Sequence, residues 1–161
     1  MRAIHKAATM LLKKIRNGFI AGTCGAIVHS LLMLVHSKAG PLPGFQPNED
    51  VQRGLAWLVG SEVNSGTAWL LSFVNGALVW SLVFAQVYRV LPGRSPWLKG
   101  IFFAILAWLV MGLLFFPFVD RGIFAGKLGL GVAPAIVMLV ALLSYSVTMA
   151  LVYDLLSKRW G

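Results

Sequence analysis

The chain has 161 residues, of which 58% are hydrophobic and 12% are charged, and its mean hydropathy is +0.81. About a quarter of the residues of a soluble domain are charged, so this composition excludes an ordinary soluble fold. The formal net charge of +9 is confined to short segments beside apolar runs, without the aromatic residues that alternate with arginines in a nucleic-acid groove. We therefore expect lipid, and no nucleic acid, as a partner.

Four runs of sequence lack a formal charge, and each reaches the roughly 20 residues that cross a hydrocarbon core of about 30 Å. These runs are residues 17–37, 63–88, 100–119 and 128–153. The chain is therefore predicted to be an all-α integral membrane protein with a single transmembrane domain over residues 1–161. The predicted spans form an antiparallel four-helix bundle and cover approximately residues 17–37, 64–88, 99–119 and 130–153.

The segment before the first span is basic. Apolar residues recur at helical spacing between Arg2 and Arg16, among lysines. This pattern predicts a basic N-terminal helix on the membrane interface; the alternative is an extension of the first span. The apolar run that follows is longer than the roughly 7 to 15 residues of a signal-peptide core, so we expect a span that is not cleaved.

Small and polar residues share one face of the first span. Six of them fall within an arc of roughly 80° on a helix that turns 100° per residue, namely Gly18, Gly22, Gly25, His29, Met33 and His36. The three glycines permit close approach of a neighbouring helix, which favours association in lipid. Gly100 and Ala104 belong to a similar stripe in the third span. We predict that both stripes pack against other helices.

The histidine-bearing face also suggests a metal site as an alternative. His29, Met33 and His36 supply imidazole and thioether groups, which copper accepts. His29 and His36 lie roughly 10.5 Å apart along a helix axis, so only one of them can pair with Met33 at a given ion. Haem is the other candidate, with His29 and Met111 as ligands, because no other span contains a histidine.

The first loop, residues 38–63, has room for a helix. Asn48 is a suitable N-cap, Glu49 and Asp50 suit a first turn, and Gly60 suits a stop. We predict a short external helix that lies in the headgroup layer; the alternative is a lid over a site at the outer face. The last connection, residues 120–131, is predicted to be a turn or a short re-entrant segment with an Asp120–Arg121 ion pair.

Residues at equal depth in the four spans predict a polar bundle centre. His29 lies twelve residues after Asn17, or roughly 18 Å along the helix. Counting the same distance along the other spans brings Asn75 and Met111 to this layer, with Tyr145 about one turn away. We expect His29 to bond either Asn75 or a backbone carbonyl.

The distribution of cations predicts the orientation. Ten of the 14 lysines and arginines flank the spans on the side of the two termini, and the other four are Lys38, Arg53, Arg121 and Lys127. Both termini are therefore expected in the cytoplasm, most simply at a bacterial inner membrane, with the basic segments against anionic headgroups.

The chain lacks the usual catalytic groups. Cys24 is the only cysteine and no carboxylate lies within a predicted span. His29 is the only intramembrane base, because His36 lies near the outer interface at the end of the first span. We therefore expect no enzyme. The leading hypothesis is an accessory or structural subunit of a larger membrane complex. The alternatives are a small oligomeric channel or transporter with a polar path through His29, Asn75 and Gln86, and a copper- or haem-binding protein that uses His29, Met33 and His36.

Overall fold

The computed structural model describes residues 2–40, 42 and 44–160, and these residues form helices and no strand. The first two helices are α1 (Arg2–Ala39) and α2 (Pro47–Val59). The second long segment comprises α3 (Ser65–Val74), the π-helix η1 (Asn75–Trp80) and α4 (Ser81–Val87). The remaining elements are α5 (Pro96–Val110), the π-helix η2 (Met111–Phe115), α6 (Phe116–Phe118), the 3-10 helix η3 (Ile123–Leu128) and α7 (Ala133–Trp160). The predicted all-α class is confirmed.

Four helical segments are long and apolar enough to cross a membrane, as the sequence predicted. They are Thr9–Ala39, Ser65–Val87, Pro96–Phe118 and Ala133–Arg159. The third begins earlier than expected because Ser95 has the extended backbone of an N-cap and Pro96 fits the first turn. The fourth continues beyond residue 153, where Lys158 and Asp154 form an ion pair of 2.7 Å one turn apart.

Of the two alternatives for the N-terminal segment, the interfacial helix is wrong and the extension of the first span is what the structure shows. A single helix runs from Arg2 to Ala39 without interruption. The reason is local: residues 2–17 contain neither glycine nor proline and are mostly good helix formers. The side chains of Arg2 and Lys6, which contributed to that prediction, lie outside the described part of the chain.

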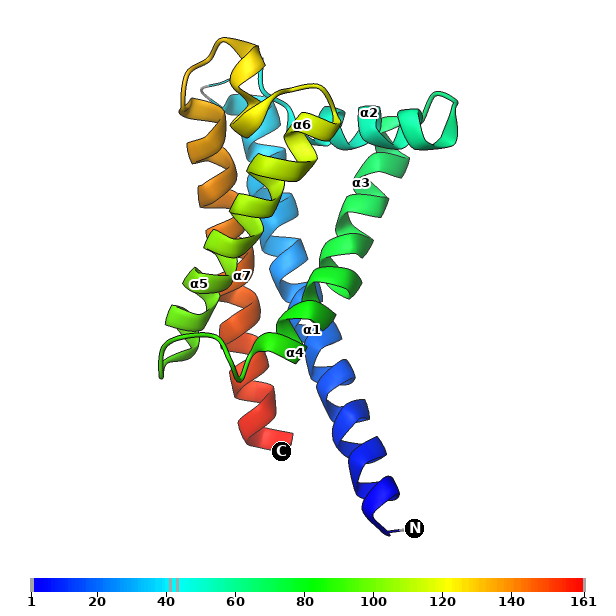
Figure 1. The fold of residues 1–161 in the computed structure, drawn as a ribbon, viewed down its shortest axis with the longest axis vertical. Coiled ribbons are helices and arrows are strands. Elements are labelled where there is room, and N and C mark those ends of the chain that lie inside the picture. Colours follow the sequence, from blue (N-terminus) through cyan, green and yellow to red (C-terminus); the bar gives the residue numbers. More distant parts are fainter. Residues whose placement is uncertain (1, 41, 43, 161) are drawn as a thin grey trace.

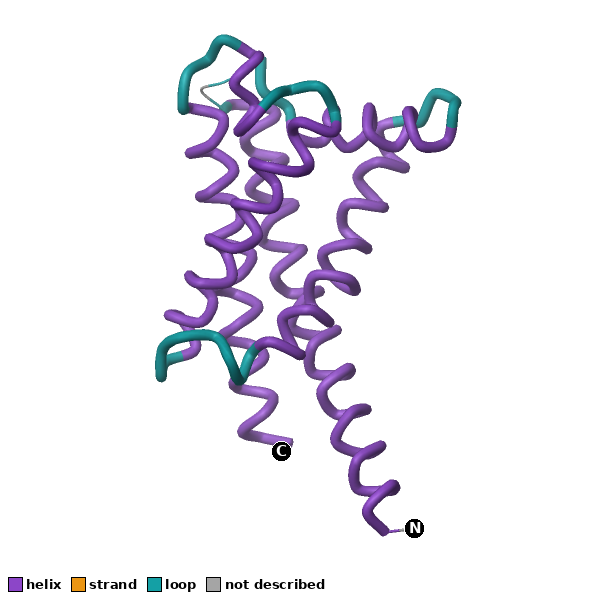
Figure 2. The backbone as a smooth tube through the Cα atoms, in the orientation of Figure 1, coloured by secondary structure: helices purple, strands orange, loops and turns teal. Residues whose placement is uncertain are grey.

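Successive long segments run in opposite directions between two ends of the molecule (Figure 1). The first turn of α1, the turn between α4 and α5, and the last turn of α7 lie at one end, which we call the terminal end. Helix α2 lies across the other end, which we call the α2 end, beside the connection that contains η3. Figure 2 shows that the loops are confined to these two ends.

Close helix contacts are made through small residues. A Cβ atom built on Gly22 would lie 2.3 Å from the Cβ of Ser81 and 2.9 Å from the carbonyl oxygen of Ala77. Gly18 faces Ala85 of the same segment at 3.2 Å, whereas Gly25 faces the carbonyl oxygen of Tyr145 in α7 at 2.8 Å. The glycine stripe of α1 therefore packs on two different helices.

The α5–α7 contact uses the second stripe. A Cβ atom on Gly100 would lie 2.8 Å from the Cα of Val147, and Ala104 is fully buried. Next to this contact, Phe84, Phe103 and Met149 are fully buried in an apolar cluster near the terminal end. A second cluster, around Phe45 and Phe116, lies at the α2 end.

The α1 contact can be tested by substitution. We expect Gly22→Leu to lower the free energy of unfolding by about 1 to 3 kcal/mol, because the new side chain would enter space that Ser81 and Ala77 occupy. Gly126→Leu is the matched control, since a Cβ at Gly126 has no atom within 4 Å. Thermal unfolding in detergent measures both, and equal melting temperatures would contradict the tight contact.

Candidate functional site

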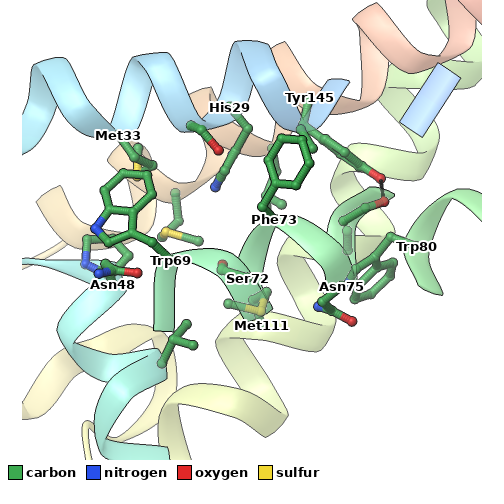
Figure 3. A pocket seen from close by; sticks show the side chains of 18 residues that line it. His29, Met33, Asn48, Trp69, Ser72, Phe73, Asn75, Trp80, Met111 and Tyr145 are labelled. Atoms are coloured by element: carbon green, nitrogen blue, oxygen red, sulfur yellow. Dashed lines mark hydrogen bonds between the residues drawn. The ribbon is translucent and has the colours of Figure 1, made fainter. Parts of the chain in front are cut away.

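A cavity of about 110 Å³ lies between the long helices in the half of the molecule nearer α2. Residues of α1, α2, α3, η1, α5, η2 and α7 line it. Figure 3 shows the side chains that surround this space. We call it the central cavity, and its lining contains no Asp, Glu, Lys, Arg or Cys among the residues that the structure describes.

The four residues of the predicted polar centre all line the central cavity. His29 projects from α1, Asn75 and Met111 come from the second and third long segments, and Tyr145 comes from α7. The depth count on straight helices is sufficient to bring these residues to one layer. It does not give their contacts, which the structure provides.

His29 is held by α7. Its Nδ1 lies 3.4 Å from the carbonyl oxygen of Ala141, and its ring meets that of Tyr145 edge to face with centroids 6.3 Å apart. A carbonyl only accepts hydrogen bonds, so in a neutral imidazole Nδ1 carries the proton and Nε2 is an acceptor. Nε2 has no partner among the described residues, and Figure 3 shows the ring directed into the central cavity.

Tyr145 connects α7 to the second long segment. Its hydroxyl donates a hydrogen bond of 2.6 Å to the carbonyl oxygen of Gly76, which lies within the π-helix η1. Gly25 provides the space for this ring, because a Cβ there would lie 2.9 Å from the Cδ2 of Tyr145. The aromatic ring is thus fixed between two helices and forms one wall of the cavity.

Both π-helices begin at residues that line the central cavity. η1 begins at Asn75 and η2 at Met111. Short π-helical turns inside α-helices are rare and occur frequently at functional sites. They were not predicted from the sequence. The one feature of the sequence that the two π-helices share is a glycine at the second position, Gly76 in η1 and Gly112 in η2.

Several polar groups in the lining lack protein partners. The hydroxyls of Ser30 and Ser72 and the carboxamide of Asn75 make no hydrogen bond within the described chain. Asn75 is also exposed, so the cavity opens to the surroundings on that side. An amide left unpaired in an apolar medium costs roughly 1 to 3 kcal/mol, and a bound molecule can remove that cost.

The aromatic part of the lining was not predicted as part of a site. Trp69, Phe73 and Trp80 come from one face of the second long segment, and Met138 comes from α7. Their spacings of four and seven residues are typical of any packed helix face, so the sequence does not distinguish a cavity wall from a core.

Helix α2 reaches the central cavity through Pro47, Asn48 and Val51. It begins one residue after Gln46, so the predicted N-cap at Asn48 is wrong, because Pro47 takes the first helical position. Its end at Gly60, in the left-handed conformation with φ 72°, is confirmed.

A buried ion pair holds α2 on the bundle. Arg121 Nε donates to Asp50 Oδ1 at 2.5 Å, and the Asp50 side chain is fully buried. The predicted Asp120–Arg121 pair is wrong: Asp120 bonds Lys127 instead, and that pair is exposed. Burial raises the pKa of the Asp50 carboxyl above its ordinary value, and the Arg121 guanidinium offsets only part of the rise.

Two predicted residues lie outside the central cavity. His36 Nε2 lies 3.0 Å from the carbonyl oxygen of Phe45, so this imidazole binds the first loop. Gln86 is exposed in α4. Met33 and His29 do line the cavity, together with Met111 and Met138. Within the described ranges, no three His, Cys, Asp or Glu side chains are grouped to hold a metal ion.

Four apolar helices of this length, with their polar side chains gathered around an internal cavity, define a helical integral membrane protein. The chain belongs to a family of unknown function, DUF6789, whose model matches residues 12–160. No curated protein matches the chain, and no solved structure does.

The attachment of α2 gives a prediction with a pH dependence. Removing one partner of a buried ion pair costs about 3 to 5 kcal/mol, so we expect Arg121→Ala to lower stability by this order at neutral pH. Lys127→Ala, which breaks the exposed pair with Asp120, is the control and should have little effect.

The pH dependence follows from the raised pKa of Asp50. A carboxyl with a raised pKa in the folded state contributes most stability at acid pH and loses it as pH rises through that pKa. Without Arg121 the pKa of Asp50 rises further, so the loss caused by Arg121→Ala should shrink as pH falls toward about 4. Unfolding curves between neutral and acid pH measure this, and a loss that grows on acidification would contradict the assignment.

Proposed function

We propose that the protein binds a neutral, membrane-dissolved amphiphile in the central cavity, with a hydroxyl group of that molecule at His29 and its polar end within the lining that includes Asn75. The observation that carries the proposal is that polar groups without protein partners line an apolar cavity inside the bundle. Largely apolar cavities with a few convergent polar groups are typical ligand sites.

The lining selects the chemical class of the ligand. Because no charged side chain lines the cavity, an anionic or cationic head would enter without a counter-charge, and this is costly in a low dielectric. His29 Nε2 accepts a hydrogen bond, whereas the Asn75 carboxamide both donates and accepts hydrogen bonds. A hydroxyl can donate to His29 Nε2, Asn75 offers a second polar contact in the lining, and Trp69, Phe73 and Trp80 supply an apolar wall for the rest of the molecule.

The access route is lateral. Helix α3 packs on α1 and α2, whereas α5 packs mainly on α7, and α3 leans away from α5 toward the α2 end (Figures 1 and 2). Asn75 is exposed on this open side. A molecule dissolved in the bilayer can thus reach the cavity from the side, while Pro47 and Val51 of α2 cover it from the end of the bundle.

The orientation belongs to the same proposal. The N-terminal part of α1, the α4–α5 turn and the end of α7 lie together at the terminal end, and they carry ten of the 14 lysines and arginines. The positive-inside rule therefore supports a bundle with both termini in the cytoplasm. In a bacterium this is the inner membrane. Trp57, Leu58 and Val59 are exposed at the end of α2, which suits a helix in the opposite headgroup layer.

The proposed role is non-catalytic. A second non-catalytic role is that of an accessory subunit in a larger membrane complex, where a helix of the partner would cover the opening beside Asn75.

A transport path through the bundle has less support. The fully buried Phe84, Phe103 and Met149 lie between the central cavity and the terminal end, and Gln86 is exposed away from the cavity.

Photolabelling tests the amphiphile proposal. The probe is a long-chain alcohol that carries a diazirine, and its methyl ether is the comparison, because the ether cannot donate to His29 Nε2. One hydrogen bond contributes about 1 kcal/mol, so we expect about fivefold more labelling of cavity peptides by the alcohol. Peptide mass spectrometry of protein labelled in nanodiscs measures the ratio.

Two variants, each of which removes one side-chain carboxamide, are compared in this experiment. Asn75→Leu should abolish most of the labelling, whereas Gln86→Leu removes an exposed amide outside the cavity and should leave it unchanged. Equal labelling by alcohol and ether, or equal effects of the two variants, would contradict the proposal.

A copper site is the second candidate, and one observation favours it. His29 lines the central cavity together with three thioethers, those of Met33, Met111 and Met138. Imidazole and thioether ligands suit Cu(I). The proposed ligand set therefore keeps His29 and Met33 and takes Met111 and Met138 in place of His36. His36 binds the first loop instead.

Elemental analysis after incubation with Cu(I) and removal of excess metal tests this candidate. A copper site predicts one ion per chain in the wild type and in His36→Ala, and loss of copper in His29→Ala. Copper retained in His29→Ala, or lost equally in both variants, would reject the cavity as the site.

A further inference from the structure

A second hollow lies at the terminal end of the molecule and is separate from the central cavity. It has a volume of about 720 Å³ and is lined by parts of α1, the end of α4, the start of α5 and the end of α7. Figure 1 shows that the first turns of α1 diverge from the end of α7, with α4 between them. We call this hollow the basic cleft, because four cationic side chains line it: Lys13, Lys14, Arg89 and Lys99.

The cations of the basic cleft line it without an acid. None of its lining residues is Asp or Glu, and Lys13, Lys14 and Arg89 form no ion pair within the described chain. The nearest acid on α7, Asp154, accepts from the Tyr88 hydroxyl at 2.9 Å and pairs with Lys158 at 2.7 Å. Like charges brought together in this way repel, and an anion between them relieves the repulsion.

Lys99 is positioned rather than free. Its Nζ donates to the carbonyl oxygen of Tyr88 at 2.6 Å and lies 4.4 Å from the centroid of the Tyr88 ring. This contact fixes one cation at the wall of the cleft, where the α4–α5 turn meets α7. Neutral donors are also present, because Tyr153 and Ser157 line the same space. Phosphate oxygens accept from both kinds of group.

The surroundings of the basic cleft indicate a lipid. Met10 and Leu11 of α1 belong to the lining and are about half exposed, at 51% and 49%. Farther along α1, Ile15 and Phe19 are also exposed and lie within the apolar segment Thr9–Ala39. A headgroup at the cations would therefore have its acyl chains against an apolar helix surface. A small soluble anion would use only the cations.

We propose that the basic cleft binds the phosphate headgroup of an anionic phospholipid from the leaflet at the terminal end. Basic pockets between transmembrane helices are known to hold such headgroups, and each Lys or Arg near an anionic surface contributes about 1 kcal/mol. The lipid joins α1, α7, the end of α4 and the start of α5 at the terminal end. This site is independent of the ligand proposed for the central cavity.

Lipid retention tests the proposal. The full chain is reconstituted in nanodiscs that contain equal amounts of phosphatidylglycerol and phosphatidylcholine with the same acyl chains, and is then released into detergent. Native mass spectrometry of the released protein counts the lipids that stay bound. We expect phosphatidylglycerol to be retained and phosphatidylcholine to be lost. Equal retention of the two lipids, or retention of neither, would overturn the proposal.

Matched double variants separate a site from general surface charge. Lys13→Gln with Lys14→Gln removes two cations of the cleft and should reduce phosphatidylglycerol retention about tenfold or more. Arg94→Gln with Arg159→Gln removes two exposed cations at the same end that do not line the cleft, and should leave retention unchanged. Equal losses in the two double variants would overturn the proposal, and elution of each as a single folded peak in size-exclusion chromatography validates the comparison.

Inorganic phosphate distinguishes a lipid from a free anion. Phosphate added before release, at a concentration far above that of the lipid, should leave phosphatidylglycerol bound, because the acyl chains add contacts with α1. Displacement of the lipid by phosphate alone would identify a small-anion site and overturn the assignment.

Discussion

The close approach of α1 to the second long segment at Gly22 is the contact on which the arrangement of this protein depends. Lipid offers no hydrophobic drive for two apolar helices to associate, so they must approach closely enough for dispersion contacts. Ser81 and Ala77 occupy the space that any larger side chain at Gly22 would need. At Gly25 the stripe turns to Tyr145 of α7. The second segment is thus held by α1 along η1 and α4, and its α3 part packs mainly on α2. The central cavity lies where the stripe of α1 changes its partner.

The number and type of the long helices could be predicted because the physics is simple: charge-free runs of sufficient length leave few alternatives in a membrane. Boundaries were harder. A helix continues beyond the apolar run when nothing interrupts it, as in the stretch of α1 before Asn17, and it begins at a local cap such as Ser95. Loop contacts depend on tertiary structure, and for that reason Arg121 was assigned to its neighbour Asp120 although it pairs with Asp50.

For the site, depth along straight helices is readable from sequence and orientation about each axis is not. Depth counting put His29, Asn75, Met111 and Tyr145 in one layer, and all four line the central cavity. Their partners depend on the π-helical turns at Asn75 and Met111, which shift the face that a helix presents. A helical wheel with a constant 100° step therefore fails after such a turn. Gln86, eleven residues after Asn75, was assigned to the same polar path, but it is exposed and does not line the central cavity.

The central cavity and the basic cleft differ in charge because they lie at different distances from the membrane surface. A charge far from the membrane surface is costly, so the central cavity contains hydroxyl, amide, imidazole and thioether groups and no ion. At the terminal end, lysine and arginine side chains reach headgroups and water, and four of them line one cleft. The buried Phe84 and Phe103 lie between the central cavity and the basic cleft. The two proposed binding sites are therefore separate. A neutral ligand in the first and an anionic lipid in the second are therefore the occupants that each electrostatic environment favours.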